Sequence, residues 1–352
     1  MTRGRNDDDW TAMSRAGAAT QDGTAPALTL ETVADLEPFS PEVGPEEPQT
    51  VPHALYAMLF GQPDAADGGA VAPLHTYAVL DAAKVSGLPE MLETSGLEHA
   101  CLFQGDAADT LRDVAPWIVR LEDGARLTRC LFTKGDAPWQ MWDNEPGIFL
   151  RSTETLQNVR RHLRKFTNVQ DEDSTSYYFR FWEPGLAAWY FESILSDAER
   201  VGQLLCLRPG AFVEVVTLDP DTAEAKRFRP IDPRRPNRPF RLEARDRTAF
   251  RRYRWVRFLT RLSDHLETHD SRLSRLPRQE RLGHADALVQ RAYAVGLSAE
   301  RAVADYATAL LLSDGRAESD AICQKILSND DHPLDKASAV LREVTQRLRH
   351  RT

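Results

Sequence analysis

The chain contains few cysteines and no long hydrophobic run. Its four cysteines, Cys101, Cys130, Cys206 and Cys323, are scattered over 352 residues and form no CxxC pair. This usage is typical of a reducing compartment, where cysteine serves as a small buried side chain, and it offers no spacing for a zinc site. No apolar run approaches the roughly 20 residues that a membrane span needs. The N-terminus also lacks the basic-then-apolar pattern of a signal peptide. We therefore expect a cytoplasmic protein with no membrane partner.

The sequence also lacks the motifs whose spacing carries a reaction. It contains no GxxxxGK[ST] loop, no GxGxxG turn after a strand and no GxSxG elbow. His265 and His269 stand one helical turn apart, but the glutamate between them is not placed as in HExxH, so we interpret them as two surface histidines. We predict no catalytic residue, no cofactor and no metal site, and we expect that the chain is not an enzyme.

Basic residues are scarce at the start of the chain. Residues 1–74 hold twelve acids and three bases, which accounts for the whole formal net charge of −9. Large apolar side chains are few over residues 1–50, so this segment cannot offset the entropy lost on ordering. We predict a disordered acidic leader over 1–50; an interaction tail is the alternative.

From residue 51 to 218 the pattern alternates between short apolar runs and helical periods. The expected strands are 76–80, 99–103, 117–121, 147–150, 177–182 and 211–216. Strands interleaved with helices are typical of α/β folds. We therefore predict an α/β domain over 51–218, with a mixed sheet and flanking helices.

The clearest helical pattern covers residues 153–166. Its apolar positions recur on one stripe, at Leu156, Val159, Leu163 and Phe166. Ser152 or Thr153 is the expected N-cap. A basic ridge lies off the stripe, formed by Arg160, Arg161, Arg164 and Lys165. A solvated face is the favoured interpretation of this ridge, and a contact with an acidic partner is the alternative.

An acidic turn precedes the expected strand 177–182. Asp171, Glu172 and Asp173 stand just before a strand that contains Arg180. We expect an ion pair across the hairpin. Binding of a cation by these carboxylates is disfavoured because consecutive side chains in a turn diverge.

Residues 219–243 contain five prolines, which disfavour helix and central strand. We predict a proline-rich basic linker there, followed by a helical C-terminal domain over 244–352. The block 226–257 carries thirteen bases and three acids, a local charge of +10, with aromatic residues among them. A nucleic-acid-binding module that uses this block is the alternative function. It is disfavoured because the aromatics of 250–258 recur at the spacing of a helical core.

A set of short motifs then resembles a known family. They are Tyr77–Asp81 with Ala82-Ala83, Leu102–Gly105, Val114–Pro116, Gly147–Leu150, Leu163–Phe166 with Val169–Asp171, and Tyr178–Phe181. Together they resemble the type VI secretion effector-adaptor family, the Tap/Tec adaptor chaperones. The resemblance covers about 54–218, and the helical C-terminal part is similar to that of the family.

The resemblance implies a cytoplasmic adaptor without enzymatic activity. Such a protein binds one effector and loads it onto the VgrG or PAAR spike of the secretion machine. The partner-binding residues that we predict are the exposed arginines of the basic ridge, the motif and the basic block: Arg160, Arg161, Arg164, Arg180, Arg251, Arg252 and Arg254. Arg180 and Asp171 occupy motif positions, for which a structural role is favoured over a partner contact.

Overall fold

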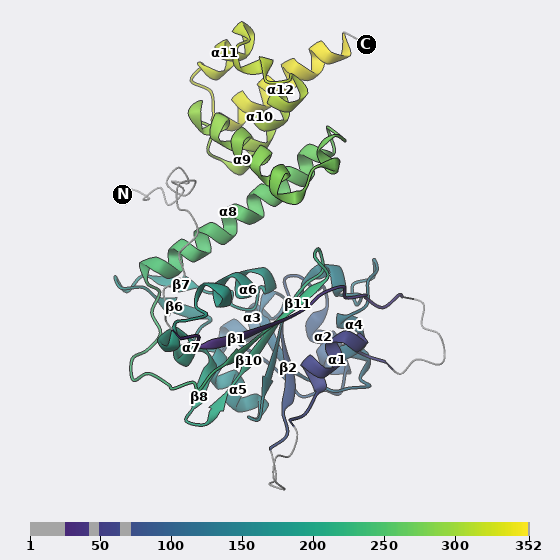
Figure 1. Ribbon diagram of the computed structural model, residues 1–352, viewed down its shortest axis with the longest axis vertical. Coiled ribbons are helices and arrows are strands. Elements are labelled where there is room, and N and C mark those ends of the chain that lie inside the picture. The colour runs from purple at the N-terminus through teal and green to yellow at the C-terminus, as the bar shows by residue number, and fades with distance from the viewer. Residues whose placement is uncertain (1–24, 42–48, 64–71, 351–352) are drawn as a thin grey trace. The chain divides into compact units, whose positions relative to one another are not determined.

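The computed structural model describes residues 25–41, 49–63 and 72–350 (Figure 1). The described chain up to Phe250 forms one compact unit, and the chain from Arg251 onward forms a second. Each unit has a hydrophobic core of its own.

The first unit is built on a sheet of seven strands. The strands of this unit are β1 (Leu28–Val33), β2 (His75–Asp81), β3 (His99–Cys101), β4 (Pro116–Leu121), β5 (Gly147–Ser152), β6 (Asn168–Gln170), β7 (Ser176–Tyr178), β8 (Cys206–Arg208), β9 (Ala211–Phe212), β10 (Glu214–Asp219) and β11 (Glu224–Pro230). The sheet order is β1-β11-β10-β5-β2-β4-β3, and β6-β7 and β8-β9 form two small hairpins. Neighbouring strands of the sheet run antiparallel.

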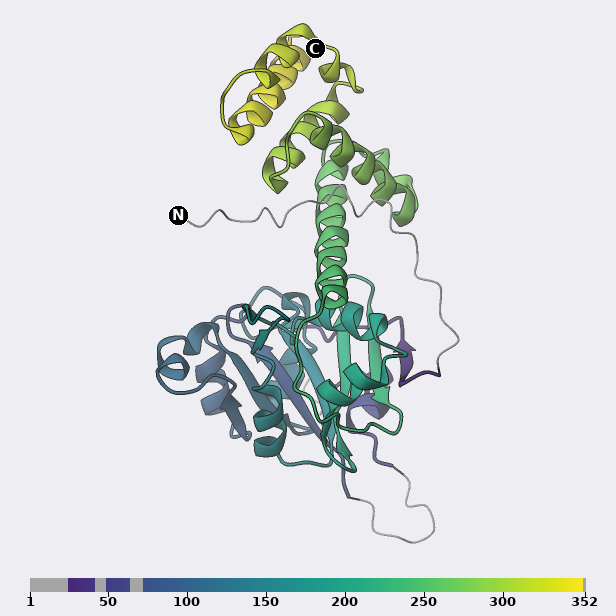
Figure 2. The same cartoon turned by 90° about the vertical axis from the view of Figure 1, so that its left-hand side faces the viewer.

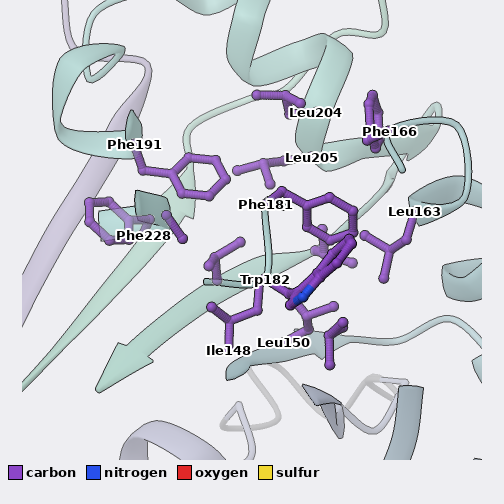
Figure 3. Packing of buried hydrophobic residues seen from close by; sticks show 14 of the residues in the cluster. Ile148, Leu150, Leu163, Phe166, Phe181, Trp182, Phe191, Leu204, Leu205 and Phe228 are labelled. Atoms are coloured by element: carbon purple, nitrogen blue, oxygen red, sulfur yellow. The ribbon is translucent and has the colours of Figure 1, made fainter. Parts of the chain in front are cut away.

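Helices cover both faces of the sheet (Figure 2). They are α1 (His53–Phe60), α2 (Leu88–Thr94), α3 (Asp106–Thr110), α4 (Arg126–Leu131), α5 (Leu156–Leu163), α6 (Pro184–Ser193) and α7 (Ala198–Leu205). Successive residues of a strand point to opposite faces. Tyr77 and Val79 of β2 therefore pack into the core beneath α5, α6 and α7, whereas Ala78 and Leu80 pack with α1, α2 and α4. Figure 3 shows the first of these cores, where Phe181 and Trp182 lie among aliphatic side chains of β5 and α7.

The second unit is helical throughout its described residues. Helix α8 (Ala244–Glu267) begins in the first unit and continues into the second, where it is followed by α9 (Arg278–Ala294), α10 (Glu300–Leu312), α11 (Ala321–Leu327) and α12 (Pro333–Arg349). Val303 and Tyr306 of α10 and Val340 of α12 are fully buried at its centre. The predicted fold class, a sheet domain with flanking helices followed by a helical part, is confirmed.

Two segments differ from the sequence predictions because strands lie where none was expected. Part of the predicted leader is strand β1, which pairs antiparallel with β11 at the edge of the sheet. Residues 1–24 and 42–48 of that leader lie outside the described residues. Strand β11 in turn occupies Glu224–Pro230 of the predicted linker and also pairs with β10. The prolines did not prevent this strand, because Pro220 precedes it and Pro230 is its last residue.

Two elements are also shorter than predicted. Helix α5 begins at Leu156, and its N-cap is Thr155, whose side chain accepts a hydrogen bond from the Asn158 backbone N–H. Neither Ser152 nor Thr153 caps it. The predicted strand 177–182 ends at Tyr178 in β7, and the chain then turns. Phe179, Phe181 and Trp182 are all buried beyond that point, so strict alternation does not hold there.

Candidate functional site

A pair of aromatic rings lies where β7 approaches the segment after β3. The rings of Phe103 and Tyr178 are 6.0 Å apart, and Tyr178 packs edge-on against Trp182 at 5.6 Å. Trp182 is buried, but Tyr178 is 53 % exposed. Tyr178 is therefore held by neighbouring rings and still exposed. Such aromatic side chains dominate protein interfaces, because on binding they bury a large area at little cost in conformational entropy.

A buried carboxylate holds the residues around this aromatic pair in place through hydrogen bonds. Asp81, the last residue of β2, has a side chain that is only 4 % exposed. Its Oδ2 accepts hydrogen bonds from Arg180 Nη2 at 2.6 Å and from Trp182 Nε1 at 2.9 Å. Its Oδ1 accepts one from the Ala83 backbone N–H at 2.9 Å. Asp81 therefore ties the chain after β7 to the end of a central strand.

Arg160 of α5 and Arg164, the C-cap residue of that helix, also lie near this region. Arg160 Nε donates a hydrogen bond to the Cys101 backbone oxygen at 2.8 Å, two residues before Phe103. Arg164 follows one turn later and is half-buried. Partial burial and the charge of Arg160 lower the pKa of the Arg164 guanidinium. We name Phe103, Tyr178, Arg160, Arg164 and Arg180 the aromatic–arginine surface.

The structure brings together three of the seven predicted arginines. Arg160, Arg164 and Arg180 lie around the aromatic pair. Arg161 is exposed elsewhere on α5 and lines a separate cavity with Lys165. The remaining three, Arg251, Arg252 and Arg254, belong to the second unit, on α8. Their role in partner binding stays a prediction.

Sequence reasoning missed Phe103, Tyr178 and Asp81 as members of the site. The signal was present, since Asp81 and Phe103 are in the motifs that resemble the adaptor family and Tyr178 precedes Arg180 by two residues. Their proximity depends on how β2, β3 and β7 are placed by the fold, which spacing along the chain does not give.

Asp171 of the acidic turn forms hydrogen bonds within its own hairpin and does not pair with Arg180. Asp171 Oδ1 accepts hydrogen bonds from the backbone N–H groups of Asp173 and Thr175, both at 2.9 Å, and Oδ2 accepts one from the Tyr177 hydroxyl at 3.1 Å. Burial opposes ionisation, but these hydrogen bonds hold the pKa of Asp171 below its usual value. The expected ion pair across the hairpin is therefore wrong, because Arg180 reaches Asp81 of β2 instead.

A second buried carboxylate attaches the start of α8 to the first unit. Asp246 Oδ2 accepts a hydrogen bond from Arg200 Nη2 at 2.6 Å, and its Oδ1 accepts one from the Tyr190 hydroxyl at 2.7 Å. The side chains of Arg200 and Asp246 are each 1 % exposed. Desolvation offsets much of the attraction in a buried ion pair, whereas loss of one partner leaves an uncompensated buried charge.

Many charges of the basic block are already paired within the first unit. Lys226 pairs with Glu192, Arg227 with Glu31, Arg229 with Glu214, Arg238 with Glu199, Arg245 with Asp197 and Arg247 with Glu172. Of the aromatics, Phe228 is fully buried and Phe240 stacks on Phe179. These contacts do not favour a nucleic-acid surface, which needs free cations and open rings.

Among the described residues, the carboxylates of Glu145, Asp219 and Asp221 lie within 4.8 Å of one another and form a group that could hold a metal ion; two of the three residues are exposed. The histidine rings of His265 and His269 are 5.0 Å apart, and His265 Nε2 lies 3.2 Å from the Thr308 hydroxyl. The first core encloses an apolar void of about 30 Å³, which has room for little more than a water molecule. No helix among the described residues is long and apolar enough to cross a membrane.

Comparison with known proteins gives one match. Residues 76–201 match the model of a family described as a domain of unknown function, DUF4123. Neither the curated proteins nor the solved structures contain a match. The matched range includes every residue of the aromatic–arginine surface and Asp81. This family is the domain family of the Tap/Tec-type adaptors, which is associated with adaptor and chaperone function toward type VI secretion effectors. Residues 76–201 therefore match the domain family of the Tap/Tec-type effector adaptors of type VI secretion.

Proposed function

We propose that the chain is an adaptor that binds a type VI secretion effector in the cytoplasm and delivers it to the VgrG or PAAR spike, without enzymatic activity. The observation that carries the proposal is the aromatic–arginine surface on the family domain. Tyr178 is 53 % exposed in a chain that buries most of its other large rings. Tyrosine, phenylalanine and arginine are enriched at the centres of protein interfaces, and lysine is depleted there.

Rigidity supports the same use of this surface. Tyr178 is held by contacts to Phe103 and Trp182, and Arg180 is held by Asp81. A binding residue that is already ordered loses less conformational entropy when a partner docks. Arg180 nevertheless keeps 41 % of its side chain exposed, so it can contact an acidic or carbonyl group of the partner.

Co-expression with the proteins encoded by the adjacent genes tests the proposal. We expect a candidate effector among them to co-purify with the tagged chain in a stable complex. The variant Tyr178→Ala should weaken this complex about tenfold or more, since truncation of an interface anchor costs about 2 kcal/mol. The adaptor proposal would be contradicted if no effector or spike protein encoded by the adjacent genes formed a complex with the chain.

The matched control is Trp139→Ala. Trp139 is an aromatic residue of the same unit with nearly the same exposure, 50 %, but it is not part of the aromatic–arginine surface. We expect its removal to leave the complex intact. An equal loss of affinity in both variants would show that the partner binds exposed aromatic rings nonspecifically and does not require this surface.

A further inference from the structure

A basic cavity lies apart from the aromatic–arginine surface. It has a volume of about 210 Å³ and is lined by residues of α5, β8 and the segment after β11: Glu154, Asn158, Arg161, His162, Lys165, Leu207, Arg208 and Arg235. Leu207, Arg208 and Arg235 lie beyond the range matched by the family model. The cavity is therefore completed by a part of the chain outside the matched domain.

The charges around this cavity do not cancel. Its one carboxylate, Glu154, is already used, because it accepts hydrogen bonds from Arg208 and from Asn158 Nδ2. The other three cations, Arg161, Lys165 and Arg235, form no ion pair with any described residue. Arg235 is held in place by a hydrogen bond of 3.0 Å from its Nη1 to the Leu207 backbone oxygen.

Lys165 is close enough to Arg235 and Arg161 to be repelled by both. Burial, followed by the charges of Arg235 and Arg161, lowers the pKa of the Lys165 ammonium. Like charges that converge without a counter-charge make their surroundings more favourable for an anion. An ordered, unbalanced cluster at a cavity is thus a place where an anionic ligand gains binding energy.

One residue that lines the cavity, His162, has a buried ring nitrogen without a hydrogen-bond partner in the described part of the chain. His162 is 3 % exposed, and its Nε2 lies 2.7 Å from the Leu204 backbone oxygen, which requires the proton to be on Nε2. Nδ1 is then a lone-pair acceptor, and it has no partner among the described residues. A buried polar atom without a protein partner calls for a specific explanation, of which an ordered water is the commonest.

We propose that this cavity binds a phosphate group, either as free phosphate or as a small phosphate monoester. A tetrahedral phosphate offers several oxygens in different directions and so can meet Arg161, Lys165 and Arg235 at once, whereas a planar carboxylate offers two oxygens that one arginine can saturate. The volume is below the 300–1,000 Å³ that is common for drug-sized ligands, which fits a small group.

Calorimetric titration of the full chain with inorganic phosphate, at pH 7.5 and constant ionic strength, tests this inference. We expect one binding site. The double variant Lys165→Ala/Arg235→Ala should lower the affinity at least tenfold, and Arg161→Ala should lower it as well. All three side chains are exposed, so their removal should leave the fold intact.

Arg234→Ala is the matched control, because Arg234 is the neighbouring residue, is 88 % exposed and does not line the cavity. We expect its affinity for phosphate to stay within twofold of the original. Equal loss in Arg234→Ala would show diffuse attraction to positive charge and would overturn the inference, as would the absence of phosphate binding.

Two further ligands distinguish the source of the phosphate group. Tighter binding of glycerol 3-phosphate than of inorganic phosphate would identify an ester as the ligand class, and equal or weaker binding would identify free phosphate. N-Acetylglutamate should bind at least tenfold more weakly than either; equal binding would contradict the choice of phosphate over carboxylate. This inference is independent of the proposed adaptor function, because the cavity shares no residue with the aromatic–arginine surface.

Discussion

Asp81 is the residue on which the geometry of the aromatic–arginine surface depends most. It is buried, it accepts hydrogen bonds from two side chains, and both donors lie about a hundred positions further along the chain. Its place in the motif Tyr77–Asp81 does not show what it binds, since a single aspartate after an apolar strand is also common at turns. Only the fold shows that it holds Arg180 and Trp182 together.

Replacement of Asp81 by asparagine should destabilise the first unit. The amide keeps the shape of the side chain but removes the charge that Arg180 and Trp182 hydrogen-bond. Hydrogen bonds to charged groups contribute about 1.5–3 kcal/mol each, and we expect a loss of free energy of unfolding of about that size. Urea unfolding measures it. The control Asp113→Asn, at a side chain that is 80 % exposed, should change the value by less than about 0.5 kcal/mol.

His162 should make stability depend on pH. Burial, together with the charges of Lys165 and Arg235, lowers its pKa to about 4 from the ordinary 6.5. The folded state therefore keeps the ring neutral while the unfolded chain takes up a proton. Its contribution is fully present above about pH 6.5 and is lost as the pH falls toward 4, by about 3 kcal/mol in total.

The measurement is urea unfolding from pH 7 to pH 4 for the original chain and for His162→Gln, which keeps a donor for the Leu204 oxygen. We expect the variant to lose less stability than the original over this range. Identical pH dependence in the two proteins would contradict the assignment of a neutral buried His162.

At the scale of elements, β5 and β2 approach so closely that one position requires glycine. A Cβ added at Gly147 would lie 1.7 Å from the Val79 backbone oxygen. The strands would have to separate at the centre of the sheet, so Gly147→Ala should destabilise the first unit by more than about 3 kcal/mol. Gly283, in α9, has open space around it. Gly283→Ala should instead stabilise the second unit by about 0.5–1 kcal/mol. Thermal unfolding checks both signs, and a neutral Gly147→Ala would contradict the register of β2 and β5.

The hairpin β6-β7 should depend on Asp171 in the same way. Asp171→Ala removes the acceptor for two backbone N–H groups and for the Tyr177 hydroxyl. We expect a loss of about 1–2 kcal/mol, similar to that of a helix cap, and increased amide hydrogen exchange over residues 171–178. Asp173→Ala is the control, because its exposed side chain accepts none of these bonds. Unchanged exchange in Asp171→Ala would be evidence against this anchoring role.

Most helices and strands that bury one regular face could be predicted from the spacing of their apolar residues. The predicted strand 76–80 corresponds to β2, and the predicted helical domain over 244–352 contains α8 to α12. Strands β1 and β11 were missed for a physical reason. At a sheet edge, β1 buries few side chains and its pattern therefore resembles that of an unfolded segment. Charged residues line β11 because they pair with acids of its neighbours.

The candidate site was predicted only in part, because sites are assembled from distant segments. Arg160, Arg164 and Arg180 were chosen for their charge, and the structure places them together. Phe103 and Tyr178 were not chosen, since an isolated aromatic residue is more often part of a core. Their exposure depends on where β7 ends and on the support from Trp182.

At the scale of the whole molecule, the basic block over 226–257 is less available to a partner than its charge suggests. The local charge of +10 over 226–257 is neutralised in large part by carboxylates of other segments of the first unit, such as Glu192 and Glu214. We therefore expect purified protein to be free of nucleic acid and to show no binding of DNA or RNA at 150 mM salt. Tight, salt-dependent retention of either would contradict this expectation.

The arginines of α8 give a separate test of the second unit. We expect the charge-reversal variant R251E/R252E/R254E to bind the effector more weakly while its circular dichroism spectrum stays unchanged. Unchanged affinity would exclude these residues from the partner surface, and the aromatic–arginine surface would then account for binding without them.

The central claim is that the chain binds an effector through the aromatic–arginine surface. The most direct measurement is the affinity for the effector encoded by an adjacent gene, compared among the original chain, Phe103→Ala/Tyr178→Ala and Trp139→Ala. The account predicts that the double variant loses at least tenfold in affinity while Trp139→Ala stays within twofold of the original. Equal affinities for all three proteins would contradict it.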